Sequence, residues 1–120
     1  MGAPERMAGS GFTRDACVDV IIPVYRGIGE TRACIESVLA SSCRTAAEII
    51  VIDDASPEPE LTRYLRGLGS AVTLLENAAN LGFVATVNRG MALHAERDVV
   101  LLNSDTVVAN DWLDRLRECA

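Results

Sequence analysis

Four short apolar runs are spaced along the chain, and each consists largely of β-branched or leucine residues. The runs are nearly continuous rather than alternating, a pattern typical of strands that are buried on both faces of a parallel sheet. The first run stops at Pro23, which has no N–H group to donate to a neighbouring strand. The pattern therefore predicts strands at residues 18–22, 49–52, 72–75 and 99–102.

The segments between these runs carry the periodicity of helices, with apolar side chains recurring three or four positions apart. The predicted stripes are Ala33, Ile35, Val38 and Leu39; Leu61, Tyr64, Leu65 and Leu68; and Val84, Val87, Met91 and Ala95, with a fourth helix beginning at Trp112. Alternating strands and helices predict a three-layer α/β/α domain with a mostly parallel sheet, right-handed crossovers and helices on both faces.

The chain is expected to form one such domain over residues 17–120. Residues 1–16 mix Gly, Pro, Ser and charged residues without periodicity and lack the apolar centre of a signal peptide, so a flexible tail is expected there. No apolar run approaches the ~20 residues that a membrane span needs. These features predict a cytoplasmic protein without a membrane span.

Composition and charge narrow the classes of function. The net charge of −6 argues against a nucleic-acid partner, because phosphate backbones attract a basic surface. The cysteines are Cys17, Cys34, Cys43 and Cys119, and no pair has the two-residue gap of a zinc knuckle or a redox motif. Reduced thiols are therefore expected. His94 falls on a predicted helix and is interpreted as a packing or surface residue.

Polar residues follow most of the predicted strands, and these positions are candidates for a ligand site. In open parallel sheets, ligands bind outside the carboxyl ends of the strands. The segments at those ends are residues 23–25, 53–56, 77–82 and 103–106. Because parallel strands end at the same edge of a sheet, these segments are expected to converge there.

Asp53 and Asp54 form an adjacent pair of carboxylates at the end of the second strand. Neighbouring carboxylates repel each other, which a structural turn does not require. A carboxylate at this position can accept hydrogen bonds from the imide of uracil or thymine, or from ribose hydroxyls. In the alternative, Asp53 ends the strand and Asp54 or Ser56 caps the next helix, with Pro57 in its first turn. Both interpretations can hold at once.

Asn103, Ser104 and Asp105 close the fourth strand. Mg²⁺ and Mn²⁺ prefer oxygen ligands, and Mg²⁺ is commonly held by one or two carboxylates together with substrate phosphates and water. Asp105 is therefore a candidate to bridge a metal ion and a diphosphate. The alternative is an Asx turn before the last helix, although Asn110 or Asp111 already supplies a cap for that helix.

Asn80 and Gly82 lead into the third predicted helix. Gly82 permits a positive φ or a close approach of the backbone, and the helix after it presents free N–H groups towards the same edge. Small residues at positions 85 and 90 let this helix pack closely. A plain loop with a packing glycine is the alternative.

A dinucleotide-binding fingerprint is the competing interpretation of the first strand exit. Gly27 and Gly29 precede the first helix, and Asp53 follows at about the distance of a ribose-binding acid. However, Arg32 stands where the third glycine is needed for close contact between helix and strand, and residues 23–26 lengthen a turn that has to be tight. The pattern therefore argues against an oxidoreductase.

Together these segments resemble the family 2 glycosyltransferases, whose GT-A fold begins with a nucleotide-binding α/β half. The matching stretches are VIIPVY at 20–25, VIDDAS at 51–56, NLGF at 80–83 with NRG at 88–90, and LLNSDT at 101–106. The resemblance covers about residues 18–117. The stretches at 80–83 and 88–90 are similar to the branch rich in rhamnosyltransferases of cell-surface polysaccharide and cell-wall synthesis.

The resemblance implies a site for a UDP- or dTDP-linked sugar. It implies that Pro23 and Tyr25 line the base pocket and that Asp54 contacts the pyrimidine. It also implies that Asp105 is the metal-binding member of a DXD-type motif for Mg²⁺ or Mn²⁺. Asn103 takes the first acidic position of that motif, which leaves one carboxylate. The substrate-binding residues predicted in this way are Pro23, Tyr25, Asp53, Asp54, Asn80, Gly82, Asn88, Asn103 and Ser104.

The implied reaction transfers the sugar, with inversion, to a hydroxyl of a saccharide or lipid-linked acceptor, while metal and helix N–H groups stabilise the leaving diphosphate. The resemblance places the general base beyond residue 120. The chain itself is therefore expected to be a truncated, inactive fragment that binds donor weakly and self-associates through an uncovered sheet edge. Two other interpretations remain: a nucleotidyltransferase, which would normally show a Gly- and Arg/Lys-rich loop after the first strand, and a non-catalytic nucleotide-binding domain.

Overall fold

The computed structural model describes residues 17–119, and the tail predicted at residues 1–16 lies outside them. Strands and helices alternate along this part of the chain, as the apolar pattern predicts. The elements are β1 (Val18–Val24), α1 (Ile28–Ala40), β2 (Ala47–Asp53), α2 (Pro59–Arg66), a 3₁₀ turn (Gly69–Ala71), β3 (Thr73–Glu76), α3 (Phe83–Met91), β4 (Val99–Leu101) and α4 (Trp112–Cys119).

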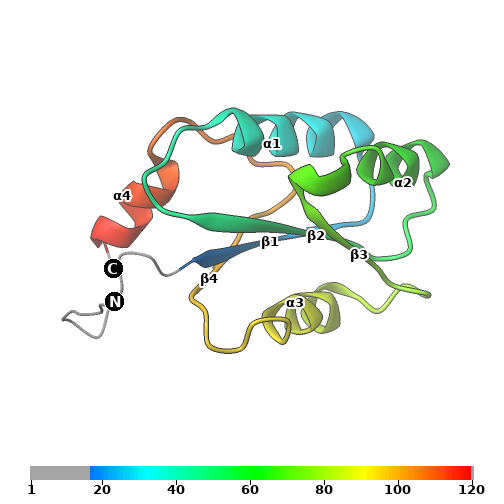
Figure 1. Ribbon diagram of the computed structural model, residues 1–120. Helices are drawn as coiled ribbons and strands as arrows, with labels where there is room; N and C mark the ends of the chain where they lie inside the picture. Colours follow the sequence, from blue (N-terminus) through cyan, green and yellow to red (C-terminus); the bar gives the residue numbers. More distant parts are fainter. Residues whose placement is uncertain (1–16, 120) are drawn as a thin grey trace.

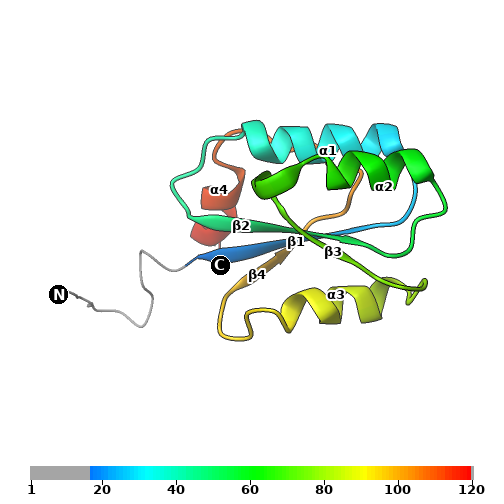
Figure 2. The same cartoon turned by 45° about the vertical axis from the view of Figure 1, so that its right-hand side comes forward.

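The strands form one parallel sheet in the order β3-β2-β1-β4. Helices α1 and α2 cover one face of the sheet and α3 covers the other (Figure 1). The same layers are visible after the molecule is turned (Figure 2). The prediction of a parallel α/β sheet with helices on both faces is therefore confirmed. Within residues 17–119, none of the helices has both the length and the apolar composition that a membrane span requires.

The two central strands, β1 and β2, form the buried part of the sheet. On the α3 face, Ile21, Ile50 and Ile52 make a small core of their own. On the α1 and α2 face, a larger core includes Val20, Ile22, Ile35, Val51, Leu61 and Leu65. The outer strands β3 and β4 are only partly buried. Burial on both faces is thus confirmed for β1 and β2 and is wrong for β3 and β4, which form the two edges of the sheet in the described part of the chain.

Helix α1 packs on the sheet with a stripe that differs from the predicted one. Ala33 and Leu39, which the apolar pattern places on that stripe, are exposed. The buried residues are Thr31, Cys34, Ile35 and Val38. These positions keep the spacing of one helix face. Two of them carry small side chains that a search for large apolar residues passes over, which explains the error.

Helix α3 also turns a different face to the sheet. Its buried residues are Thr86 and Gly90, whereas Val84 and Met91 are 70% and 44% exposed. The helix ends at Met91, so Ala95 lies beyond it. The predicted apolar stripe is therefore wrong, because small side chains rather than large ones face the strands.

Gly90 explains why α3 packs on the sheet through the face that carries Thr86 and Gly90. A Cβ atom at Gly90 would lie 2.8 Å from Cδ1 of Ile52 and 3.1 Å from Cγ2 of Ile21. The expected close packing of this helix thus occurs at Gly90, while the other small residue, Ala85, is exposed. The close contact sets the last turn of α3 against the strands, and the start of the helix lies at the carboxyl edge of the sheet, where the polar segments gather.

A polar network at the opposite, amino edge joins the segment after α3 to β1 and β2. Asp19 is fully buried, and its carboxylate lies 2.8 Å from Nδ1 of His94 and accepts a hydrogen bond of 2.9 Å from Arg97. Arg97 also donates to Glu48 at 2.8 Å, and this bond is the main reason why the pKa of the Glu48 carboxyl lies below its usual value. The paired cation offsets the cost of burying the Asp19 charge.

We expect Gly90→Ala to lower the free energy of unfolding, because crowding in a packed core costs about 1–3 kcal/mol and outweighs a helix-propensity gain of about 1 kcal/mol. Gly29→Ala is the matched control, since Gly29 also lies in a helix and a Cβ atom there meets nothing within 4 Å. The control is expected to be neutral or stabilising. Urea unfolding followed by circular dichroism measures both variants. Equal stability of the two would contradict the close approach of α3.

Candidate functional site

A cleft of about 680 Å³ opens at the carboxyl ends of the strands, at the edge where a ligand site is predicted. The segments that follow β1, β2, β3 and β4 all contribute to its wall. Most of the predicted site residues line it, namely Pro23, Tyr25, Asp54, Asn80, Gly82, Asn103, Ser104 and Asp105. The fold therefore brings together segments that are far apart in the sequence.

Asp53 and Asn88 are the predicted site residues that do not line the cleft. Asn88 is exposed on α3. The Asp53 carboxylate is almost fully buried; it accepts a hydrogen bond of 2.8 Å from the backbone N–H of Ser56 and one of 2.7 Å from the Thr62 hydroxyl. Both oxygens of Asp53 are thus engaged in shaping the connection between β2 and α2.

The start of α2 differs from the predicted capping scheme. The helix begins at Pro59, not near Pro57, and its N-cap residue Glu58 makes no capping hydrogen bond through its side chain. Ser56 accepts a hydrogen bond of 3.1 Å from the backbone N–H of Glu58, one residue before the helix. The Glu58 carboxylate instead accepts hydrogen bonds of 3.2 and 3.3 Å from the backbone N–H of Gly27, at the start of α1.

Asp54 is the polar centre of the cleft wall. One oxygen accepts hydrogen bonds from the Asn77 amide at 2.8 Å and from the backbone N–H of Leu81 at 2.7 Å. The other accepts from the Asn80 amide at 2.9 Å and from the backbone N–H of Gly82 at 3.0 Å. Burial raises the pKa of Asp54, but these hydrogen bonds outweigh it and hold the pKa below its usual value. The carboxylate is therefore charged and fixed in position.

The hydrogen bonds of Asp54 continue into α3 through Asn77. The Asn77 amide also donates to the Thr86 hydroxyl at 3.0 Å, and its carbonyl accepts a hydrogen bond from Arg89. Asn77 and Thr86 are buried. Asn77 begins the candidate segment 77–82 but is not among the predicted binding residues, and Thr86, on the buried face of α3, carries no signal in the sequence.

Gly82 begins α3 with φ +91°, a conformation that residues with a side chain rarely adopt. The expected positive φ is therefore confirmed. The N–H groups of Leu81 and Gly82 point at Asp54 rather than at open solvent. The loop between β3 and α3 is thus built around the Asp54 carboxylate.

Residues 103–105 form the part of the cleft wall that follows β4, and hydrogen bonds from α1 support the segment 103–108. The Cys34 thiol donates to the carbonyl of Asn103 at 3.6 Å, and the Ser37 hydroxyl accepts a hydrogen bond of 3.0 Å from the backbone N–H of Val108. Burial raises the pKa of Cys34, so the thiol stays protonated. Asp105 is exposed in the cleft wall, and among the groups that the structure describes, none forms a hydrogen bond or ion pair with its carboxylate.

The caps expected before α4 take another form. Asn110 accepts a hydrogen bond of 2.9 Å from the backbone N–H of Ser42, so its side chain joins two loops instead of capping the helix. Asp111 has φ +65°, and its backbone carbonyl accepts a hydrogen bond of 2.9 Å from the backbone N–H of Arg115 in the first turn of α4. The backbone of Asp111 therefore begins this helix.

Oxygen donors suited to a divalent cation lie at the exit of β4. Asp105, with its uncommitted carboxylate, and the preceding residues Asn103 and Ser104 all line the cleft. This donor set fits Mg²⁺ or Mn²⁺, which prefer oxygen ligands and share their coordination with phosphates and water.

A second possible metal-binding group lies at the amino edge of the sheet, away from the cleft. It consists of Asp19, Glu48 and His94. Arg97 donates a hydrogen bond to each of the two carboxylates. Because this guanidinium already pairs with both carboxylates, we interpret the group as part of the structural network at the amino edge.

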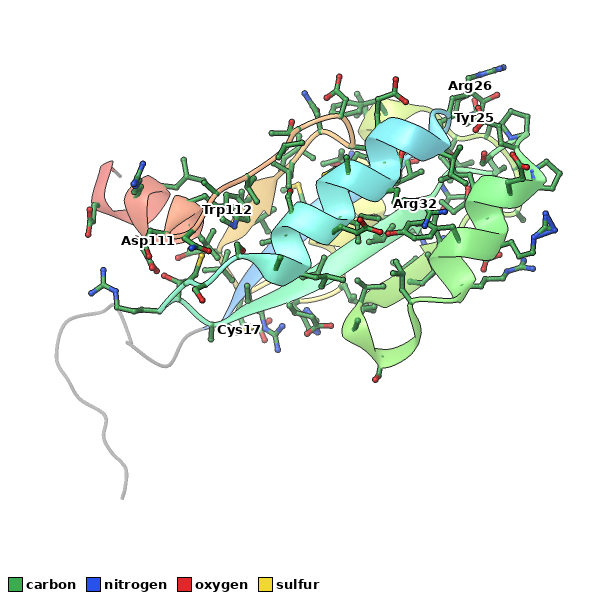
Figure 3. All side chains as sticks on the ribbon, turned by 90° about the horizontal axis from the view of Figure 1, so that it is seen from above. Cys17, Tyr25, Arg26, Arg32, Asp111 and Trp112 are labelled. Atoms are coloured by element: carbon green, nitrogen blue, oxygen red, sulfur yellow. The ribbon has the colours of Figure 1, made fainter. Side chains whose placement is uncertain are left out.

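The segment after β1 contributes residues that sequence analysis did not assign to the site. Arg26, Gly27 and Glu30 line the cleft beside Tyr25. The Arg26 guanidinium lies 5.0 Å from the centre of the Tyr25 ring, and both side chains project beyond the same end of α1 (Figure 3). The sequence signal for Arg26 and Gly27 is their position directly after β1, and Glu30 follows in the first turn of α1. The remaining unassigned wall residues are Val24, Phe83 and Thr86.

Two curated relatives are similar to most of this chain. The uncharacterized protein y4gI of Sinorhizobium fredii is 30% identical over 103 residues, which are 82% of this chain and 11% of the relative. The uncharacterized glycosyltransferase YibD of Escherichia coli is 33% identical over 93 residues, which are 76% of this chain and 26% of the relative. The chain therefore spans about a tenth of the length of y4gI and about a quarter of the length of YibD.

Solved structures share the fold at low sequence identity. TarS of S. aureus (residues 1–349) in complex with UDP superposes with a TM-score of 0.70 at 18% identity, over 84% of this chain and 31% of that one. GalNAc-T7 with UDP, GalNAc and Mn²⁺ gives 0.66 at 23% identity, over 81% and 19%. The mannosyltransferase PcManGT of Pyrobaculum calidifontis with GDP-Man and Mn²⁺ gives 0.63 at 23% identity, over 75% and 28%.

The fold and the sequence lead to the same assignment. The parallel α/β sheet is that of the GT-A glycosyltransferases. The family model described as "Glycosyl transferase family 2" matches residues 19–118, nearly the whole of the described chain. The chain therefore belongs to glycosyl transferase family 2.

Proposed function

We propose that this chain supplies the donor-binding half of an inverting, metal-assisted glycosyltransferase that uses a UDP- or dTDP-linked sugar. The observation that carries the proposal is the meeting of Tyr25, Asp54 and Asp105 in one cleft of a family 2 chain. The aromatic face of Tyr25 and the fixed carboxylate of Asp54 suit the base, and the uncommitted carboxylate of Asp105 suits a metal-bound diphosphate. The complexes of TarS and GalNAc-T7 with UDP, and of PcManGT with GDP-Man, support a nucleotide-sugar donor, and the choice of a pyrimidine base rests on the residues of the cleft wall.

In this proposal, the nucleoside lies against Pro23 and Tyr25, with Asp54 at the pyrimidine edge. Asp54 is held in its charged form by four hydrogen bonds from the protein. A charged carboxylate attracts the imide N–H of uracil or thymine. Guanine offers a different pattern of donors and acceptors, so the pocket is expected to distinguish pyrimidine from guanine nucleotides.

Asp105, Asn103 and Ser104 would hold the divalent cation. When bound, Mg²⁺ or Mn²⁺ supplies positive charge to the diphosphate that leaves as the sugar is displaced. Because Asp105 is the carboxylate left in the motif, phosphate oxygens and water have to complete the coordination. Metal binding is therefore expected to depend strongly on the presence of the nucleotide diphosphate.

The acceptor in this proposal is a hydroxyl of a saccharide or a lipid-linked carrier in polysaccharide or cell-wall synthesis, in the cytoplasm. The stretches at 80–83 and 88–90 support a rhamnosyltransferase-like branch. The acceptor proton has to pass to a general base, and we assign no described residue to that role. Donor binding is proposed for this chain, and sugar transfer for the whole protein.

The open side of β4 supports a proposal of self-association. In the part of the chain that the structure describes, β4 pairs with β1 and no strand lies against its other side. Leu101 is 42% exposed on this strand. An unpaired strand with an exposed apolar side chain is a template for pairing with another copy.

Asp105→Ala is expected to abolish the Mn²⁺-dependent part of UDP binding, because it removes the carboxylate assigned to the metal. The thermal midpoint is expected to stay nearly unchanged, since Asp105 is exposed. Asp98→Ala is the control, since it removes an exposed carboxylate at the opposite edge of the sheet. Isothermal titration calorimetry with UDP, with and without Mn²⁺, measures the effect. A variant that binds like the wild type in Mn²⁺ would refute the metal role.

We expect the wild type to bind UDP or dTDP more tightly than GDP. Asp54→Asn is expected to weaken UDP binding about tenfold and to reduce this preference, since the loss of a hydrogen bond to a buried partner costs about 1–3 kcal/mol. Asp53→Asn is the matched control, because Asp53 lies outside the cleft. Competition binding gives the affinities, and thermal melts separate loss of binding from loss of fold. Equal affinity of the wild type for these diphosphates would count against the assignment.

Leu101→Lys is expected to reduce self-association, because a charge on an edge strand opposes pairing with a second copy. Size-exclusion chromatography with light scattering over a range of protein concentrations measures the oligomeric state. Val84→Lys serves as the control, since Val84 is 70% exposed on the outer face of α3 rather than on the strand. A wild type that stays monomeric at every concentration would contradict the proposal.

A further inference from the structure

The cleft has an unusual charge balance for a site that receives a nucleotide diphosphate. Among the described residues that line it, the carboxylates are Glu30, Asp54 and Asp105, and the single cation is Arg26. A diphosphate adds further negative charge to this wall. Binding therefore needs positive charge from the metal, from the protein or from both.

Arg26 is placed to supply that charge from the protein. It directly follows Tyr25 at the end of β1 and precedes Gly27, the N-cap residue of α1 with φ +88°. Its side chain is exposed and reaches beyond the end of α1, stacked on the Tyr25 ring (Figure 3). The left-handed turn at Gly27 separates Arg26 from the helix, so the side chain stays at the mouth of the cleft.

Arg26 differs from four other arginines, which form ion pairs. Arg32, Arg44, Arg66 and Arg97 each lie within 4.0 Å of a carboxylate. Within the described part of the chain, Arg26 has no carboxylate partner, and its guanidinium stacks on the ring of Tyr25. The N–H donors of the guanidinium are therefore available to a ligand.

We propose that Arg26 binds the diphosphate of the donor and acts as a second source of positive charge beside the metal. The inference rests on the proposed function, which it deepens by naming the protein group that recognises the diphosphate. Because Asn103 is neutral, Asp105 is the carboxylate left in the metal motif, so the metal alone is weakly held by protein. A planar guanidinium matches phosphate oxygens with parallel hydrogen bonds. Tyr25 holds the arginine close to the place where the nucleoside lies.

The stack on Tyr25 could also serve only to support the ring. This structural role and the proposed binding role predict that different ligands lose affinity when Arg26 is replaced. If Arg26 only supports the Tyr25 ring, its removal disturbs the wall that receives the base, and uridine and UDP weaken together. If Arg26 binds the diphosphate, UDP and pyrophosphate weaken while uridine does not. The affinity difference between UDP and uridine therefore separates the two.

The test compares Arg26→Gln and Arg26→Lys with Arg32→Gln by calorimetry, using UDP, uridine and pyrophosphate with and without Mn²⁺. Arg32 is a matched control, because it stacks on Tyr64 at 4.4 Å and lies outside the cleft. We expect Arg26→Gln to weaken UDP binding about tenfold without metal, the effect of one charge-assisted hydrogen bond, and to leave uridine binding unchanged. Arg26→Lys should retain part of the affinity, and the Arg32 variant should behave like the wild type.

The outcomes distinguish this inference from the proposed function. Equal weakening of uridine and UDP, or wild-type UDP affinity in Arg26→Gln, would overturn the role of Arg26 alone. A wild type that binds pyrophosphate through Arg26 but binds UDP no more tightly than pyrophosphate, and does not bind uridine, would support the anion-binding role and contradict the proposed donor. A wild type that binds none of these ligands would overturn both.

Discussion

The Asp54 carboxylate is the constraint on which the cleft depends. It lies at the end of the buried strand β2 and accepts hydrogen bonds from the loop that joins β3 to α3. A charged group with little access to water is stable only when its acceptor sites are filled, so the loop cannot relax without exposing that charge to an apolar surround. The positive φ of Gly82 lets the backbone turn its N–H group towards Asp54. One side chain thus fixes the wall of the cleft and the start of α3.

Two supports outside the cleft keep the opposing walls in place. On one face of the sheet, Gly90 allows α3, the helix that follows Gly82, to lie close against Ile21 and Ile52. On the other face, Cys34 and Ser37 of α1 hold the segment that contains Asn103. The polar residues of the cleft therefore depend on close packing in both outer layers, and core substitutions are coupled to the geometry of the site.

Charge connects the architecture to the chemistry of a family 2 glycosyltransferase. The wall of the cleft carries more carboxylates than cations, which suits a metal-bound ligand and disfavours a bare anion. Asp54 is engaged with the protein, whereas Asp105 and Arg26 lack carboxylate or cation partners in the described part of the chain. In the proposed function, Asp105 and Arg26 face the diphosphate, while Asp54, which is engaged with the protein, shapes the pocket that receives the base.

The sequence alone determined the order of strands and helices and the edge at which the site lies, because buried parallel strands require apolar runs and their polar exits share one edge. Tertiary structure decided which faces of α1 and α3 are buried, since close contact selects Thr31, Thr86 and Gly90 by size rather than by hydrophobicity. It also separated the roles of Asp53 and Asp54. Adjacent side chains at a strand end point to opposite faces, so Asp53 binds the connection to α2 and Asp54 enters the cleft. Pattern and composition treat the two carboxylates as equivalent, and only the packed layers on either side of the sheet distinguish them.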